Sequence, residues 1–91
     1  MYKIKTYTVL KAAFLKVTVK ASLVKNKKLD VFRNNIYICS IGDTRYSDYP
    51  TYLQTHGLAY ATNRRKLYKN RHENDRHIFN TPGYYADQLL W

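Results

Sequence analysis

Residues 29–41 read LDVFRNNIYICSI, two apolar, β-prone runs separated by Asn34-Asn35. Asparagine tolerates the positive φ angles of a two-residue turn, so the pattern predicts a β-hairpin with strands over 29–33 and 36–41. Gly42 then ends the second strand. The single cysteine, Cys39, lies in the apolar run of that strand, and we expect it to be a small buried hydrophobic residue.

The segment before the hairpin fits two periodicities. Alternation over residues 2–6 and the β-branched run at 17–19 favour strands, which we place near residues 2–9 and 14–21. A helical spacing competes with this interpretation and connects six apolar residues: Leu10, Ala13, Phe14, Val17, Ala21 and Val24.

Helices are expected after the hairpin. Asp48 can cap a short helix over residues 49–56, with Pro50 in its first turn and Gly57 just past its end. A longer helix, rich in good helix formers, is expected from about residue 58 to residue 71.

The last element begins at Thr81, which can cap a helix with Pro82 at its first position, and it runs over residues 84–91. The sequence therefore predicts an α+β fold, a small β-hairpin sheet from the N-terminal half with two or three short helices packed on one face. We expect one small domain over residues 17–91, preceded by a basic strand or arm over residues 1–16.

Charge is the strongest functional signal in the chain. Sixteen Lys and Arg face six Asp and Glu, a formal net charge of +10 on 91 residues, and residues 1–29 carry eight lysines and no acid. A surface of this kind attracts polyanions. Nucleic acid, an anionic membrane face and an acidic protein are the partner classes that fit.

A basic cluster with aromatic neighbours is the best candidate for contact with nucleic acid or another polyanion. Arginine forks and lysine charges bind phosphates, and tyrosine rings stack on bases. The alternative is a solvated helix face. The candidate residues are Arg64, Arg65, Lys66, Lys69, Arg71, Arg76, Tyr60 and Tyr68, together with Lys25, Lys27 and Lys28 of the turn before the hairpin.

Other chemistry finds little support in the sequence. The histidines and Cys39 lack the paired spacing of a structural metal site, no serine has an evident base, and the three glycines are isolated. We expect a protein that is not an enzyme, with no cofactor, no metal, no small-molecule substrate and no membrane span. Asp48 should cap a helix or pair with an arginine such as Arg71.

Several short motifs resemble a family of small, basic, uncharacterised proteins of bacteriophages and giant DNA viruses. The similarity covers roughly residues 17–91. The matching residues are Leu29-Asp30-Val31-Phe32, Ile41-Gly42, Tyr46-Ser47-Asp48-Tyr49, Tyr68, Arg71-His72, Glu73, Thr81-Pro82-Gly83-Tyr84-Tyr85-Ala86 and Leu89-Leu90-Trp91. The resemblance implies a viral setting. It also implies that Asp48, His72 and Trp91, with Arg71, form a buried structural clasp between hairpin and helix.

The leading functional expectation is a non-enzymatic virion component, a minor capsid or cement-type protein. It would use its basic surface to bind capsid subunits or the packaged genome, in the virion and, before assembly, in the host cytoplasm. The alternatives are a protein that binds DNA or RNA in the infected cell, and a small inhibitor of a host protein.

Overall fold

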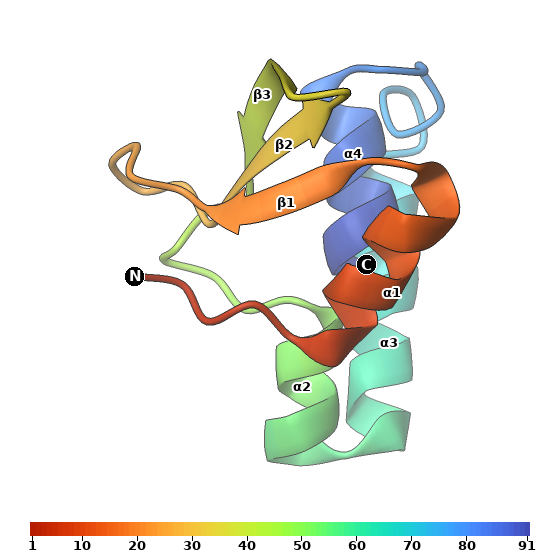
Figure 1. Cartoon of the computed structure of the whole chain (residues 1–91). Helices are drawn as coiled ribbons and strands as arrows, with labels where there is room; N and C mark the ends of the chain where they lie inside the picture. The colour runs from red at the N-terminus through yellow and green to blue at the C-terminus, as the bar shows by residue number, and fades with distance from the viewer.

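A computed structural model describes residues 1–91, and it confirms the predicted α+β class: one three-stranded sheet and four helices. In Figure 1 helix α4 passes beside the sheet, α1 packs against α4, and α2 and α3 extend away from the sheet as an antiparallel pair. The elements are α1 (Thr6–Leu15), β1 (Thr18–Ala21), β2 (Leu29–Arg33), β3 (Ile36–Ile41), α2 (Tyr49–His56), α3 (Leu58–Arg71) and α4 (Pro82–Leu90).

The hairpin over residues 29–41 is confirmed. Strand β2 pairs antiparallel with β3, and β1 pairs antiparallel with the other edge of β2. Asn34 and Asn35 have φ of 52° and 65°, the left-handed angles that a tight two-residue turn needs. Cys39 is buried, as expected. The side chains that β2 and β3 bury give the sheet one apolar face for the helices.

The predicted strand near residues 2–9 is wrong, and the strand near 14–21 is reduced to Thr18–Ala21, because residues 6–15 form helix α1. The helix is fixed by tertiary contacts: Thr8 is fully buried and donates a hydrogen bond to the carbonyl of Leu89 (2.8 Å), and Ala12 joins the core. Lys16, in the left-handed conformation, ends the helix. Packing against α4 therefore overrides the local strand propensity.

Two of the three later helices begin at the predicted caps. The Asp48 carboxylate accepts a hydrogen bond from the Thr51 amide at the start of α2, and the Thr81 hydroxyl accepts one from the Tyr84 amide at the start of α4. Gly57 separates α2 from α3, with a φ of 87°. All three predicted helices are confirmed.

The core lies where α4 and α1 meet the sheet. Nine buried residues form it, and Tyr85, Leu89 and Leu90 of α4 supply a third of them. The others are Ala12, Val17, Leu29, Val31, Cys39 and Ile41. Helix α4 therefore docks on the sheet as expected, whereas the exposed face of α1 carries Leu10 and Phe14, which are 65% and 85% exposed.

A buried ion pair joins three parts of the chain. Lys28 Nζ lies 2.8 Å from Asp48 Oδ2, and both side chains are almost inaccessible. Tyr2 Oη donates a second hydrogen bond to the same oxygen at 2.8 Å. Burial alone would raise the pKa of Asp48, but hydrogen bonds from Lys28 and Thr51 bring it below its ordinary value. The N-terminal segment, the sheet and α2 meet at this one carboxylate.

Replacing Asp48 should destabilise the protein strongly. In the variant Asp48→Asn the Lys28 ammonium stays buried without its counter-charge. We therefore expect the free energy of unfolding to fall by about 3–5 kcal/mol. The matched control is Asp43→Asn, which removes a surface carboxylate paired with Arg45 and should leave the free energy of unfolding almost unchanged, because solvent screens that pair. Urea unfolding of both variants measures the difference. Equal effects would contradict the role given to the buried pair.

The same carboxylate should make stability depend on acid pH. Because the pKa of Asp48 is lowered in the folded state, its contribution is complete above its unfolded pKa of about 4 and is lost as pH falls below that value. Thermal unfolding followed from pH 7 downwards, through about pH 4, should show this loss. In the variant Asp48→Asn, the stability lost below that pH should be smaller than the stability that the parent protein loses.

Candidate functional site

A cleft of about 670 Å³ lies between helix α3, the end of α4 and the loop from β3 to α2. Its size falls within the range of about 300–1,000 Å³ that is usual for ligand sites. Gly42, at one wall, leaves no room for a side chain, because a Cβ there would lie 2.9 Å from Leu90 Cδ1. The lining residues are Lys28, Gly42, Asp43, Tyr46, Ser47, Tyr52, Arg64, Tyr68, Arg71, His72, Ala86, Leu90 and Trp91.

Aromatic rings form one side of this cleft. The rings of Tyr68 and Trp91 are stacked almost parallel, at 4.4 Å and 7°, and His72 also stacks on Tyr68, at 4.3 Å. Tyr52 lies 6.2 Å from Trp91 at a tilt of 51°. Burial raises the pKa of Tyr68 to about 12, so its hydroxyl stays neutral at physiological pH. The cleft thus offers preformed ring surfaces next to polar groups.

Two arginines of α3 face the cleft without an acidic partner. Arg64 lies over the ring of Tyr52 (5.6 Å), and its buried Nε has no hydrogen-bond partner. Arg71 is exposed, and it follows Arg64 by seven residues, which places both on one flank of the helix. Neither belongs to any ion pair of the chain. Because no carboxylate neutralises them, these two guanidinium groups are available to an anionic ligand.

The other charges of the cleft are already neutralised. Lys28 is paired with Asp48, and Asp43 accepts two hydrogen bonds from the Arg45 side chain, at 3.0 and 2.8 Å. Those hydrogen bonds lower the pKa of Asp43 to about 2, so it stays ionised. The surplus charge of the cleft is therefore the two guanidinium groups, which favour an anionic ligand.

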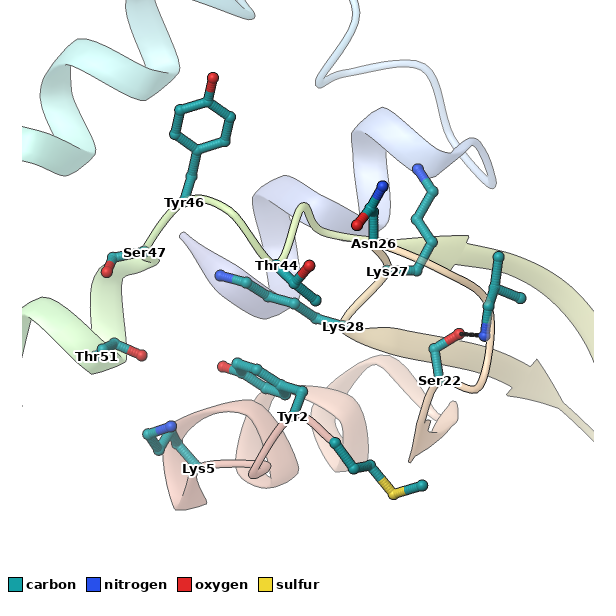
Figure 2. A pocket seen from close by; sticks show the side chains of 12 residues that line it. Tyr2, Lys5, Ser22, Asn26, Lys27, Lys28, Thr44, Tyr46, Ser47 and Thr51 are labelled. Atoms are coloured by element: carbon teal, nitrogen blue, oxygen red, sulfur yellow. Dashed lines mark hydrogen bonds between the residues drawn. The ribbon is translucent and has the colours of Figure 1, made fainter.

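A second hollow of about 530 Å³ adjoins the cleft, since the two share Lys28, Tyr46 and Ser47. Figure 2 shows that Lys28 reaches between the loop that carries Tyr46 and the ring of Tyr2. Lys5 and Lys27 add two cations without acidic partners to its lining. The two hollows therefore lie next to each other at the β3–α2 loop, and each carries cations without acidic partners.

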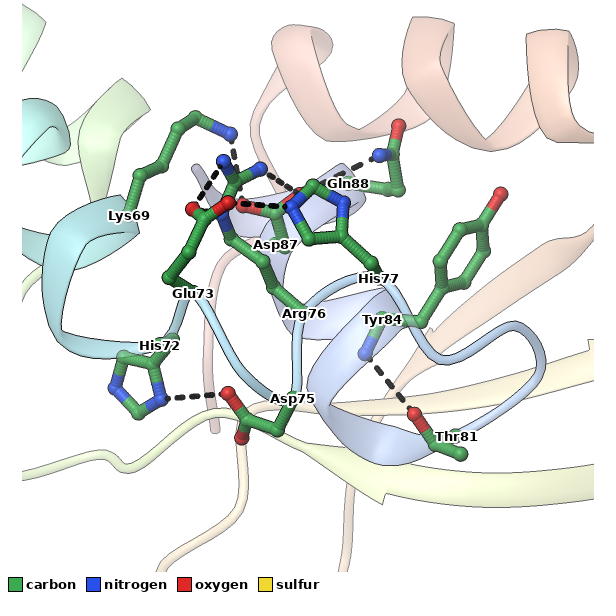
Figure 3. A network of polar contacts seen from close by, with 10 residues as sticks. All are labelled: Lys69, His72, Glu73, Asp75, Arg76, His77, Thr81, Tyr84, Asp87 and Gln88. Carbon is green, nitrogen blue, oxygen red and sulfur yellow. Dashed lines mark hydrogen bonds and ion pairs between the residues drawn. The ribbon is translucent and has the colours of Figure 1, made fainter.

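Three of the predicted contact residues are used inside the protein, and Lys28, buried with Asp48, is the first of them. Lys69 Nζ lies 2.7 Å from the buried carboxylate of Asp87. Arg76 pairs with Glu73 at 2.7 Å and with Asp87 at 3.7 Å, and His77 also contacts Glu73. Figure 3 shows this network between the end of α3, the loop that follows it and α4. These charged side chains therefore stabilise the packing of α4 and the preceding loop against α3.

The remaining predicted contact residues are dispersed. Arg65 lies over Tyr49 (4.1 Å) on another flank of α3, Lys66 is exposed outside both hollows, and Tyr60 stacks on His56 (4.3 Å). Lys25 is exposed in the turn beside Lys27. The structure therefore brings Arg64, Arg71 and Tyr68 together at the cleft, where Lys28 is the one other predicted contact residue, already paired with Asp48.

The expected clasp separates into two sites. Asp48 caps α2, the first of the two alternatives predicted for it, and its ion pair is with Lys28 and not with Arg71. His72 and Trp91 instead stack with Tyr68 and line the cleft. His72 Nδ1 also lies 3.5 Å from Asp75.

Sequence reasoning missed Tyr46, Tyr52 and Lys5 as residues of the site. No spacing in the sequence points to Tyr52, because it reaches the cleft through the packing of α2 against α3. Tyr46 lies in the motif Tyr46-Ser47-Asp48-Tyr49, in which only the Asp48 carboxylate was predicted to have a role. Lys5 was one of eight similar lysines.

Comparisons with known proteins found no matching family model, no matching curated protein and no matching solved structure. The resemblance to the viral family therefore stays a prediction. No group of three or more His, Cys, Asp and Glu is arranged to hold a metal ion. None of the helices is both long enough and apolar enough to cross a bilayer.

Proposed function

We propose that this protein binds nucleic acid without catalysing a reaction, and that the cleft is its principal contact. The observation that carries the proposal is the pair Arg64 and Arg71, two guanidinium groups without acidic partners beside stacked rings. Guanidinium groups bind phosphate oxygens, and aromatic rings stack on bases. This set of side chains therefore fits both the backbone and the bases of a nucleotide chain.

The charge distribution supports the same proposal. Lys28, Arg45, Lys69 and Arg76 are the bases that pair with a carboxylate, which leaves twelve of the sixteen bases free to attract a polyanion. We propose binding because the unpaired charges of the cleft are arginines, which donate hydrogen bonds but do not exchange protons at neutral pH.

Removing the two arginines should weaken binding and reduce its salt dependence. For the variant Arg64→Met/Arg71→Gln we expect affinity for nucleic acid to fall roughly a hundredfold or more, because each of the two charge-assisted contacts is worth about 1.5–3 kcal/mol. The slope of log affinity against log salt should become shallower by about 2. Fluorescence anisotropy with a labelled oligonucleotide, repeated over a salt series, measures both.

The matched control is Lys3→Gln/Lys16→Gln, which removes two exposed positive charges outside the two hollows. The affinity of this control for nucleic acid should fall only a few-fold, because the electrostatic field of the whole molecule is slightly weaker. Folding of the arginine variant should be preserved to within about 1 kcal/mol, since the buried Arg64 Nε makes no hydrogen bond that would be lost. An unchanged salt slope in the arginine variant would contradict the cleft as the contact.

A second candidate function is a structural component of a virus particle, which the resemblance implies. The observation that favours it is the number of large apolar side chains that the fold leaves more than half exposed, among them Leu10, Phe14, Leu23, Ile36, Ile78 and Phe79. Neighbouring subunits would cover such side chains. In purified particles the protein should then be present at a fixed ratio to the major capsid protein after nuclease and salt washes, measured by mass spectrometry; its absence would exclude this function.

A further inference from the structure

We infer that the cleft selects single strands: an unpaired base enters it against Trp91 and Tyr52, and the strand leaves through the second hollow toward Lys27 and Lys5. This inference rests on the proposed function and narrows it, from nucleic acid in general to strands whose bases are accessible.

The position of the rings is the first argument. Trp91 is only partly exposed and Tyr52 is half-buried, and both line the cleft from the inside. In a duplex the base faces are covered by their neighbours, so rings recessed in a cleft cannot reach them. A strand with splayed bases can place one base in the cleft, where stacking on a ring contributes about 1–3 kcal/mol.

The spacing of the arginines is the second argument. Arg64 and Arg71 lie two turns apart on α3, a rise of about 10 Å along the helix. That separation of the two helix positions is compatible with contacts to phosphates along a strand that follows the cleft. Trp91 and Tyr52 come from the end of α4 and from α2, so the base and its phosphates contact different walls of the cleft.

The second hollow gives the strand an exit. Tyr46 stands at the junction of the two hollows, 70% exposed, and its ring offers a second platform for a base. Beyond it lie Lys27, which is exposed, and Lys5, whose ammonium lies over the ring of Tyr2 at 4.9 Å. Asp43, at the rim, is neutralised by Arg45 and does not repel the chain.

Tryptophan fluorescence tests this inference directly, because Trp91 is the single tryptophan of the chain and lies in the cleft. The probes are a DNA strand of about ten nucleotides, the same sequence as a duplex, and a strand of equal length without bases. We expect the single strand to quench Trp91 and to bind roughly tenfold or more tighter than the duplex. The strand without bases should bind, more weakly, and leave the fluorescence unchanged.

Two exposed variants test the exit path without disturbing the fold. Tyr46→Ala and Lys27→Gln should each weaken single-strand binding, the tyrosine variant roughly fivefold or more, while Trp91 is still quenched. The matched control is Tyr37→Ala, since Tyr37 is also an exposed tyrosine but lies on β3 outside both hollows.

The outcomes separate the two proposals. Equal affinity for duplex and single strand, without a change in Trp91 fluorescence, would overturn the inference and leave nucleic-acid binding intact. Parent-like binding by both exit variants would overturn the path through the second hollow. Failure of every probe to bind would overturn the proposed function together with the inference.

Discussion

The buried ion pair between Lys28 and Asp48 is the contact on which the rest of the structure depends. Burying two charges is costly, and the cost is recovered only with close geometry and additional hydrogen bonds. Here Tyr2 and the Thr51 amide supply them, so one carboxylate fixes the N-terminal segment, the start of β2 and the start of α2. Because Lys28 and the loop before Asp48 also line both hollows, the pair sets the walls of the candidate site as well.

The scarcity of acids explains how the same chain is stable and strongly basic. Asp48 and Asp87 are buried, and each holds two elements together by pairing with a lysine. Arg64 and Arg71 are left without a carboxylate beside rings that pack the end of α4 against α3. The structural charges and the proposed binding charges are thus different residues, and the binding charges can be removed without opening the core.

Local sequence signals were enough for much of the fold. Asn34-Asn35 between two β-prone runs specified the hairpin, and Asp48 and Thr81 marked helix starts, because turns and caps depend on residues that are neighbours in the chain. Helix α1 was missed because its conformation depends on residue 89: Thr8 bonds the Leu89 carbonyl, while the apolar Leu10 and Phe14, which the helical pattern connected, face outward. The apolar pattern of α1 therefore did not identify its buried side.

By itself the sequence determined the α+β class, the hairpin, the three later helices and the positive charge, all of which follow from composition and from contacts between near neighbours. The tertiary structure alone decided which charges are free. Lys69 and Arg76 looked equivalent to Arg64 and Arg71, yet the first two pair with Asp87 and the other two face the cleft. The reason is physical: a side chain's electrostatic partner is set by which elements pack together, and Asp87 lies eighteen residues from Lys69 along the chain but 2.7 Å away in space.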